Sequence, residues 1–256
     1  MNEAEVLFSE ITNLSREKLY LNWDKPITAQ QAEYLSSVIK RRINGQPIEY
    51  ILGKTEFMGL EFKVSPDVLI PRPETEILVE ETLKLASKNP KILDIGTGSG
   101  CIAVSLAKML PLAKISAVDI SPVCLKQASE NAKMHNVEID FIESDIFSCL
   151  SCESGKYDII VSNPPYIRTG DIKRLEPEVK CQPRLALDGC EDGLYFYKKI
   201  IPSAGEFLES GGFLVLEIGF DQLSQIEDIF KKQNKLKIVK KVKDYQQYNR
   251  FVIAQG

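Results

Sequence analysis

From Lys91 onward, short apolar runs alternate with amphipathic stretches, and this alternation constrains the fold more than any other feature of the sequence. Strands are expected at 91–95, 115–120, 139–143, 157–162 and 213–218, and helices at 100–109, 122–134, 194–209 and 222–233. Strands that alternate with helices form a parallel sheet covered on both faces. A last pair of strands, 236–242 and 250–254, is close enough in sequence to form a hairpin. The sequence therefore predicts an α/β protein.

The first 75 residues have a different pattern and are predicted to form separate units. Residues 1–45 are rich in helix formers, and Thr28 with Gln31 has the form of a capping box that opens a helix ending at Gly45. Residues 49–65 change to an aromatic, glycine-containing pattern that favours a β-hairpin, and a proline-rich link follows before a helix at 74–86. The expected division is 1–45, 46–75 and 76–256. The helical module either packs on the main domain or recognises a macromolecular partner.

Composition limits the classes of partner. The 256 residues are 44% hydrophobic and 27% charged, which supports a sizeable core and argues against disorder. The net charge of −4 does not favour nucleic acid or anionic membrane. No apolar run approaches the roughly 20 residues of a membrane span. The acidic start, Met1 to Glu5, is unlike a secretory signal, so a cytoplasmic protein is expected.

Cysteine and histidine usage favours neither disulfides nor a metal site. The six cysteines are scattered and are expected to be reduced thiols. Cys149 and Cys152 form a CxxC pair with no second pair, so a structural or loop role is favoured over metal or redox chemistry. The single histidine, His135, is expected at a solvent-facing helix end. One histidine makes a histidine-based triad and a multi-histidine metal site improbable, and no metal is expected.

A glycine-rich turn follows the first strand of the α/β region. It runs from Asp94 through Gly96, Thr97, Gly98, Ser99 and Gly100 into the expected helix. Glycines let the backbone approach a ligand closely, and the amides at a helix N-terminus carry partial positive charge. The first two glycines match the dinucleotide fingerprint GxGxxG, but the third does not. No GxxxxGK[ST] sequence supports phosphate hydrolysis.

Acidic residues stand at the ends of the next two strands. Asp119 ends the second strand, where a carboxylate can accept hydrogen bonds from both ribose hydroxyls. Asp145 ends the third strand and could bind an adenine amine, with Ile146 covering the ring. Because the carboxyl ends of strands in an open α/β sheet share one crevice, these residues predict a nucleoside-cofactor site. Arg72, in the proline-rich link, either lines this cleft or forms a surface salt bridge.

The fourth strand ends in Asn163-Pro164-Pro165-Tyr166. Prolines cannot donate to a sheet ladder and fix their own backbone angle, so they end the strand in a stiff turn. The turn is expected to aim an amide, a bare carbonyl and an aromatic ring at the cleft, which suits recognition of a planar amine or amide. Asn-Pro also occurs as a plain turn, and the glycine loop upstream favours the functional interpretation.

These motifs carry a resemblance to known enzymes. The glycine loop with Asp119 resembles S-adenosylmethionine-dependent methyltransferases of the Rossmann-like class, which implies a mostly parallel sheet with a C-terminal antiparallel hairpin. Asn-Pro-Pro-Tyr resembles the signature of their amino-methylating branch. Four further stretches, 46–53, 57–60, 70–76 and 217–219, resemble the PrmC/HemK family, and with them the resemblance covers nearly the whole chain.

The resemblance implies a function and a set of roles. Members of the PrmC/HemK family methylate the glutamine of the Gly-Gly-Gln motif in class I peptide chain release factors, with S-adenosylhomocysteine as the product. Asn163 and the carbonyl of Pro164 would orient the glutamine amide, Pro165 would stiffen the turn and Tyr166 would pack on the substrate. The cofactor would be held by Gly96, Thr97, Gly98, Ser99, Gly100, Asp119, Asp145, Ile146 and Asn163. A cytoplasmic monomer with no direct nucleic-acid or membrane contact is expected.

Two departures from the family pattern and several alternatives stand beside this interpretation. Cys190 occupies a position where the family usually has glycine, and Gln247-Tyr248 replaces another expected glycine. Both departures are expected to lie away from the strand-end site. The alternatives are methylation of a ribosomal protein glutamine, methylation of adenine in nucleic acid, or a catalytically silent cofactor-binding module on the translation machinery. A dinucleotide-dependent oxidoreductase would leave Asn-Pro-Pro-Tyr unexplained.

Overall fold

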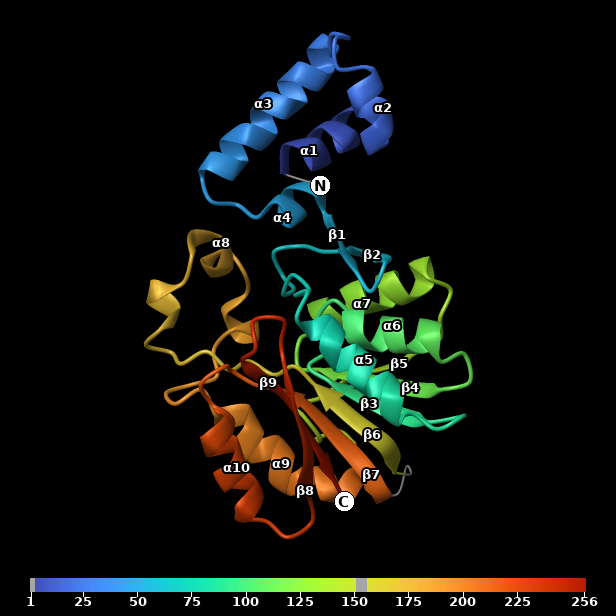
Figure 1. Cartoon of the computed structure of the whole chain (residues 1–256), viewed down its shortest axis with the longest axis vertical. Coiled ribbons are helices and arrows are strands. Elements are labelled where there is room, and N and C mark those ends of the chain that lie inside the picture. The colour runs from blue at the N-terminus through green and yellow to red at the C-terminus, as the bar shows by residue number, and fades with distance from the viewer. Residues whose placement is uncertain (1–2, 151–155) are drawn as a thin grey trace.

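A seven-stranded sheet forms the centre of the computed structural model, which describes residues 3–150 and 156–256 (Figure 1). The strands are β3 (Lys91–Ile95), β4 (Lys114–Asp119), β5 (Asp140–Glu143), β6 (Tyr157–Ser162), β7 (Leu208–Glu217), β8 (Lys237–Lys243) and β9 (Asn249–Gln255). Their order is β5-β4-β3-β6-β7-β9-β8. The first five in this order are parallel, and β9 runs antiparallel to both β7 and β8. The predicted mostly parallel sheet with a C-terminal hairpin is confirmed.

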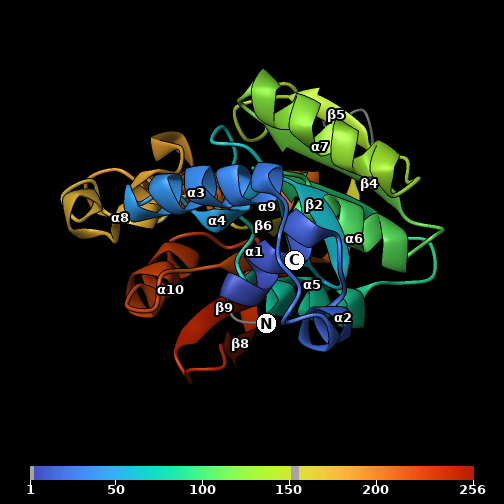
Figure 2. The same ribbon diagram turned by 90° about the horizontal axis from the view of Figure 1, so that it is seen from above.

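Helices cover both faces of the sheet, as the alternation predicts (Figures 1 and 2). One face carries α5 (Thr75–Leu85), α6 (Cys101–Met109) and α7 (Pro122–Met134), and the other carries α9 (Tyr195–Phe207) and α10 (Leu223–Lys231). Each helix layer buries its apolar side chains against the sheet in its own core cluster. The hydrophobic effect therefore holds the sheet between two layers.

The end of α9 differs from the prediction. The stretch Glu209–Gly212 was expected to close a helix reaching Glu209, but the helix stops at Phe207 and the stretch belongs to β7. Leu208 pairs with Tyr157 of β6, and the amide of Gly256 donates to the carbonyl of Gly212 at 3.0 Å. Because the backbone here finds partners in the sheet, strand pairing replaces the expected turn.

The strand order reverses direction at β3, and this reversal positions the site. The chain moves from β3 outward to β4 and β5, then returns to place β6 on the other side of β3. Connections on the two sides leave in opposite directions, so a crevice opens above the carboxyl ends of β3 and β6. The glycine loop follows β3, and Asn163 follows β6.

The N-terminal helices form a cluster at the top of Figure 1. They are α1 (Glu3–Thr12), α2 (Arg16–Leu21), α3 (Ala29–Ile43) and α4 (Ile48–Leu52). Thr28 and Gln31 form the predicted capping box of α3, with both reciprocal hydrogen bonds present. Arg42, at the end of α3, forms ion pairs with Glu3 and with Glu178 of α8 (Pro177–Lys180).

The β-hairpin is shorter than the sequence suggests. Residues 48–52 are the helix α4, ended by Gly53 at φ +74°, and only β1 (Lys54–Phe57) and β2 (Leu60–Lys63) form the hairpin. The hydroxyl of Tyr50 donates to the carbonyl of Val68 at 2.5 Å, which ties α4 to the following link instead of a strand partner. His135 was expected to face solvent, but it is half-buried and its ring lies 5.4 Å from that of Phe62.

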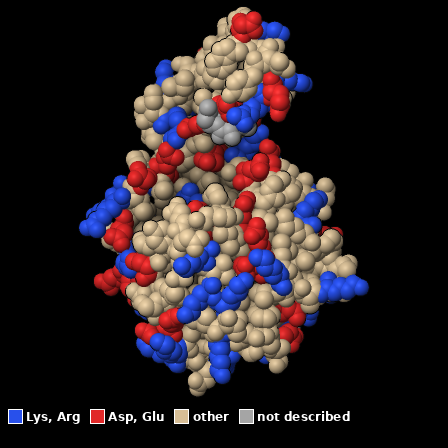
Figure 3. All heavy atoms as spheres, in the orientation of Figure 1, with Lys and Arg blue, Asp and Glu red and all other residues tan. Residues whose placement is uncertain are grey.

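Charged side chains mingle over the face shown in Figure 3. The edge strand β8 is rich in lysine. Two of these lysines form ion pairs, Lys240 with Glu81 and Lys241 with Glu227. Exposed lysines on an edge strand also discourage pairing with another chain. Within the described ranges, no helix is long and apolar enough to cross a membrane.

Candidate active site

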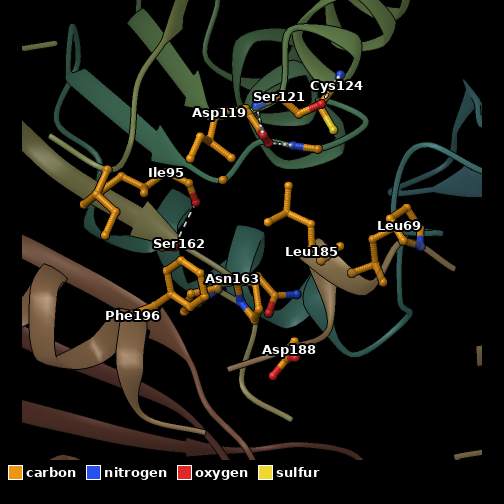
Figure 4. Close-up of a pocket in the computed structure, with 18 of the residues that line it drawn as sticks. Leu69, Ile95, Asp119, Ser121, Cys124, Ser162, Asn163, Leu185, Asp188 and Phe196 are labelled. Carbon is orange, nitrogen blue, oxygen red and sulfur yellow. Dashed lines mark hydrogen bonds between the residues drawn. The ribbon is translucent and has the colours of Figure 1, made fainter. Parts of the chain in front are cut away.

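A cavity of about 610 Å³ opens above the carboxyl ends of the central strands. Its walls come from the glycine loop, the ends of β4, β5 and β6, the start of α9 and the segment around η3 (Arg184–Ala186). Figure 4 shows Asp119 and Ser121 at one end and Asn163, Phe196 and Asp188 at the other, with Leu185 reaching between them. The size and mixed polarity are typical of a small-molecule site.

The glycine loop divides into residues that face the cavity and residues that support them. Gly96 and Gly98 line the cavity. Thr97, Ser99 and Gly100 are buried behind it: the hydroxyl of Thr97 donates to Asp94 at 2.7 Å, and the carbonyl of Ser99 accepts from Asn131 at 2.8 Å.

Gly100 allows the close approach of two helices. It has φ +81°, and a Cβ added there would stand 2.9 Å from the Cβ of Ala128 on α7. A side chain at this position would be both strained and in collision. The glycine that shifts the loop away from the dinucleotide fingerprint therefore serves the packing of α6 against α7.

Asp119 is held rigidly at the edge of the cavity. One carboxylate oxygen accepts from the amide of Gly98 and the other from the amide of Ser121, both at 2.9 Å. Burial raises the pKa of Asp119, while these amide hydrogen bonds act in the opposite direction. Each oxygen retains acceptor capacity for a ligand, because a carboxylate offers about four lone-pair sites.

Asp145 and Ile146 follow β5 and both line the cavity. Asp145 is partly exposed, and Lys199 of α9 lies 3.1 Å from its carboxylate. Ile146 is 8% exposed and adopts φ +58°, a conformation that costs energy for a β-branched residue. The amide of Asp145 and the hydroxyl of Ser148 lie 3.1 Å apart, which helps to hold this bend.

The Asn-Pro-Pro-Tyr turn contributes three of its residues to the cavity. Asn163, Pro164 and Pro165 line it, whereas Tyr166 points behind it and donates its hydroxyl to Glu217 at 3.3 Å. Burial raises the pKa of the Tyr166 phenol, and Arg250 lies 5.5 Å from its ring centre. The side-chain nitrogen of Asn163 donates to the hydroxyl of Thr75 at 3.1 Å.

Thr75 and Glu217 are buried partners of this turn. Thr75 begins α5 and is 2% exposed, and Glu217 ends β7 and is 1% exposed. The hydroxyl of Thr75 donates to Glu217 at 2.7 Å. Burial raises the pKa of Glu217 to about 7, although Thr75, Arg250 and Tyr166 favour its charged form. Their roles were missed from sequence, but both lie in stretches that carry the family resemblance.

The segment beyond the turn also differs from expectation. Cys190 was expected to lie away from the site, but it lines the cavity with Asp188 and Leu185, because the segment returns beside Ile167 through a bridge to Asp188. Cys190 has φ +68° and Gln247 has φ +67°, so both departures from glycine occupy left-handed backbone positions. No periodic pattern marks Leu185 or Phe196 as cavity residues.

Arg72 lines a separate cavity of about 430 Å³, between α4 and α8, and donates to Gln182 at 3.0 Å. Arg72 therefore neither lines the cofactor cleft nor forms a surface salt bridge with a described residue, the two positions considered from sequence. In the part of the chain that the structure describes, no three His, Cys, Asp or Glu side chains are grouped to hold a metal ion. Cys152 of the CxxC pair lies outside the described residues.

Two family matches together span most of the chain. Residues 1–53 match the PrmC N-terminal domain, and residues 73–176 match the methyltransferase small domain. The release factor glutamine methyltransferase of Geobacter sulfurreducens is 45% identical over 229 residues, which cover 89% of this chain and 80% of that protein. The one from Fusobacterium nucleatum is 39% identical over 258 residues, covering 99% of this chain and 72% of that protein.

A solved structure supports the fold independently. A methyltransferase from Pyrococcus furiosus superposes with a TM-score of 0.60 at 20% sequence identity, covering 86% of this chain and 98% of that one. At this identity the likeness concerns the fold alone.

Proposed function

The chain belongs to the release factor glutamine methyltransferase family, and on that premise we propose that it methylates the glutamine side chain of the Gly-Gly-Gln motif in class I peptide chain release factors. The protein is an S-adenosylmethionine-dependent protein-glutamine N-methyltransferase. The observation that carries the proposal is the position of Asn163. Its amide stands at one end of a cavity whose other end holds the carboxylate of Asp119.

The residues that line the cavity fit S-adenosylmethionine. A Cβ built on Gly96 or Gly98 meets no atom within 4 Å, so the backbone leaves room for a ligand to approach closely. Asp119 would accept hydrogen bonds from ribose hydroxyls, and Asp145 from the adenine amine. Ile146 offers an apolar surface for the ring. Thr97, Ser99 and Gly100 would contribute by holding the loop in shape.

The chemistry rests on positioning rather than on a titrating base. S-adenosylmethionine, when bound, supplies an electrophilic methyl group. A glutamine amide nitrogen is a weak nucleophile because its lone pair is delocalised. The side-chain oxygen of Asn163 and the carbonyl of Pro164 would each accept one amide hydrogen and so aim the nitrogen at the methyl group. The nitrogen–carbon bond would form as the methyl–sulfur bond breaks, with S-adenosylhomocysteine as the leaving group; those oxygens would stabilise the developing positive charge, and one amide proton would leave to solvent.

The other residues of the turn would act around this pair. Pro165 lines the cavity and keeps the turn stiff. Tyr166, expected from sequence to pack on the substrate glutamine, has its hydroxyl directed to Glu217. We assign Tyr166 to the wall of the cavity, beneath the substrate glutamine.

The wider assignments belong to the same proposal. Residues 1–45 would recognise the release factor, 46–75 would connect the two parts, and 76–256 would carry out the transfer. The protein would act in the cytoplasm, where release factors work, as a monomer and without binding nucleic acid directly. The match of residues 1–53 to the PrmC N-terminal domain supports a separate N-terminal unit in this division.

Mass spectrometry of a purified class I release factor tests the proposal. After incubation with this protein and S-adenosylmethionine, the Gly-Gly-Gln peptide should gain one methyl group. Asn163→Ala should lower the rate by about 100-fold or more, because orientation of the amide is lost, while calorimetry shows nearly unchanged cofactor affinity. Asn234→Ala, at an exposed asparagine away from the cavity, is the matched control and should keep full activity. Methylation of a different residue, or full turnover by Asn163→Ala, would refute the assignment.

A further inference from the structure

Three segments far apart in the sequence meet directly behind Asn163. Asn163 follows β6, Glu217 ends the neighbouring strand β7, and Thr75 begins α5. The parallel register pairs Ser162 with Leu216, so the next residues along the chain, Asn163 and Glu217, lie side by side. The hydroxyl of Thr75 lies between them, 3.1 Å from Asn163 and 2.7 Å from Glu217.

The number of hydrogens that Asn163, Thr75 and Glu217 can donate to one another restricts the orientation of the Asn163 side-chain amide. A hydroxyl has one hydrogen to donate, and an ionised carboxylate can only accept. While Glu217 is ionised, the hydroxyl hydrogen of Thr75 is committed to its carboxylate, and toward Asn163 the hydroxyl can offer only a lone pair. The side chain of Asn163 must then present its NH₂ group to Thr75, which turns its oxygen away, toward the cavity. The opposite orientation would set two acceptor oxygens against each other.

Glu217 is itself held by neighbours on several elements. Its second carboxylate oxygen accepts from Tyr166, and its backbone carbonyl accepts from the fully buried Tyr197 at 2.9 Å. Arg250 of β9, whose guanidinium lies 5.5 Å from the centre of the Tyr166 ring, supplies positive charge nearby. A buried carboxylate so closely held costs desolvation free energy, and the contacts to α5 and β6 give it a specific role.

We infer that Thr75 and Glu217 are positioning residues that fix the side-chain amide of Asn163 with its oxygen toward the cavity. This inference rests on the proposed function, because it is the oxygen of Asn163 that would accept the substrate amide hydrogen. It gives a physical reason for two stretches that resemble the family but do not touch the cavity at these residues: the one that contains Thr75 and the one that begins at Glu217.

Substitutions at Thr75 separate the effect of its hydroxyl on the rate from the effect of its side-chain packing. Thr75→Val keeps the shape and removes the hydroxyl, Thr75→Ala removes it without a branched side chain, and Thr75→Ser keeps it. We expect Val and Ala to lower kcat by about 10- to 100-fold, since a mispositioned amide costs rate, and Ser to restore most of it. Cofactor affinity, measured by calorimetry, should change less than about twofold, because Thr75 does not line the cavity. Thr75→Val or Thr75→Ala that folds and retains wild-type kcat, or Thr75→Ser as impaired as Thr75→Val, would overturn the inference.

A double-mutant cycle with Asn163→Ala tests whether Thr75 acts through Asn163. If it does, adding Thr75→Val to Asn163→Ala should cause no further loss of single-turnover rate. A further loss equal to that of Thr75→Val alone would show an independent role and refute the inference. Failure of the proposed function looks different, because Asn163→Ala alone would then retain turnover.

Glu217→Gln provides a second route. The glutamine carbonyl can still accept from Thr75, but the glutamine amide can also rotate and donate. The hydroxyl of Thr75 can then act either as donor or as acceptor toward residue 217. We expect a fall in kcat smaller than that of Thr75→Val, again without loss of cofactor affinity. A fall larger than that of Thr75→Val, or none, would contradict a role exerted through the threonine hydroxyl.

Discussion

Glu217 should make the folded protein less stable as the pH rises. Burial raises its pKa from 4.5 to about 7, while Thr75, Arg250 and Tyr166 act against that rise and Glu74 adds to it. The folded state therefore binds a proton that the unfolded state releases between these two pH values. The unfolding free energy from this group is fully present below about pH 4.5 and is lost as the pH rises toward and through 7.

The magnitude follows from the two pKa values. The difference between 4.5 and about 7 corresponds to about 3 kcal/mol, at 1.36 kcal/mol for each pH unit. Glu217→Gln has nearly the same shape, can still accept from Thr75 and does not titrate. Relative to the wild type, this variant should gain about 3 kcal/mol of unfolding free energy between pH 4.5 and pH 8.

Urea unfolding without cofactor, followed by circular dichroism at several pH values from 4.5 to 8, measures this difference. Other titrating groups, including the buried Asp94 whose pKa is also raised to about 7, contribute to both proteins and cancel in the comparison. Glu209→Gln changes an exposed glutamate on the same strand and should show no pH-dependent gain. A difference between Glu217→Gln and wild type that stays flat with pH, or falls as pH rises, would refute the reasoning.

Three further predictions concern the cavity and its supports. Asp119→Ala should weaken S-adenosylmethionine binding by about tenfold or more in calorimetry, because hydrogen bonds to a charged acceptor are lost. Gly100→Ala should destabilise the protein by about 2 kcal/mol or more in thermal unfolding, because φ is +81° and the new Cβ meets Ala128 at 2.9 Å. Cys190→Gly should stabilise it by about 0.5–1 kcal/mol, because the left-handed backbone at φ +68° suits glycine.

Each of these has an outcome that would count against it. Unchanged cofactor affinity for Asp119→Ala would show that the Asp119 carboxylate does not bind the cofactor. A wild-type melting temperature for Gly100→Ala would mean that α6 and α7 can separate without cost. A destabilised Cys190→Gly would show that contacts of the thiol outweigh the backbone strain.

The sequence alone determined the elements and the general place of the site. Hydrophobic periodicity predicted the strands and helices of the α/β region to within a few residues, except at the start of β7. This works because apolar spacing, glycine and proline act on the backbone over a few residues. The strand-end positions of Gly96, Asp119 and Asn163 followed from the same patterns, since parallel strands bring their carboxyl ends to one edge.

Only the tertiary structure decided what stands behind the site. Thr75 lies 88 residues from Asn163 and 142 from Glu217, and no local pattern links the three. The tertiary fold likewise brought Cys190 into the cavity wall and turned Tyr166 toward Glu217. These contacts depend on strand register, helix docking and the few partners available to buried polar groups. These contacts are properties of the whole packed chain, so local sequence patterns do not predict them.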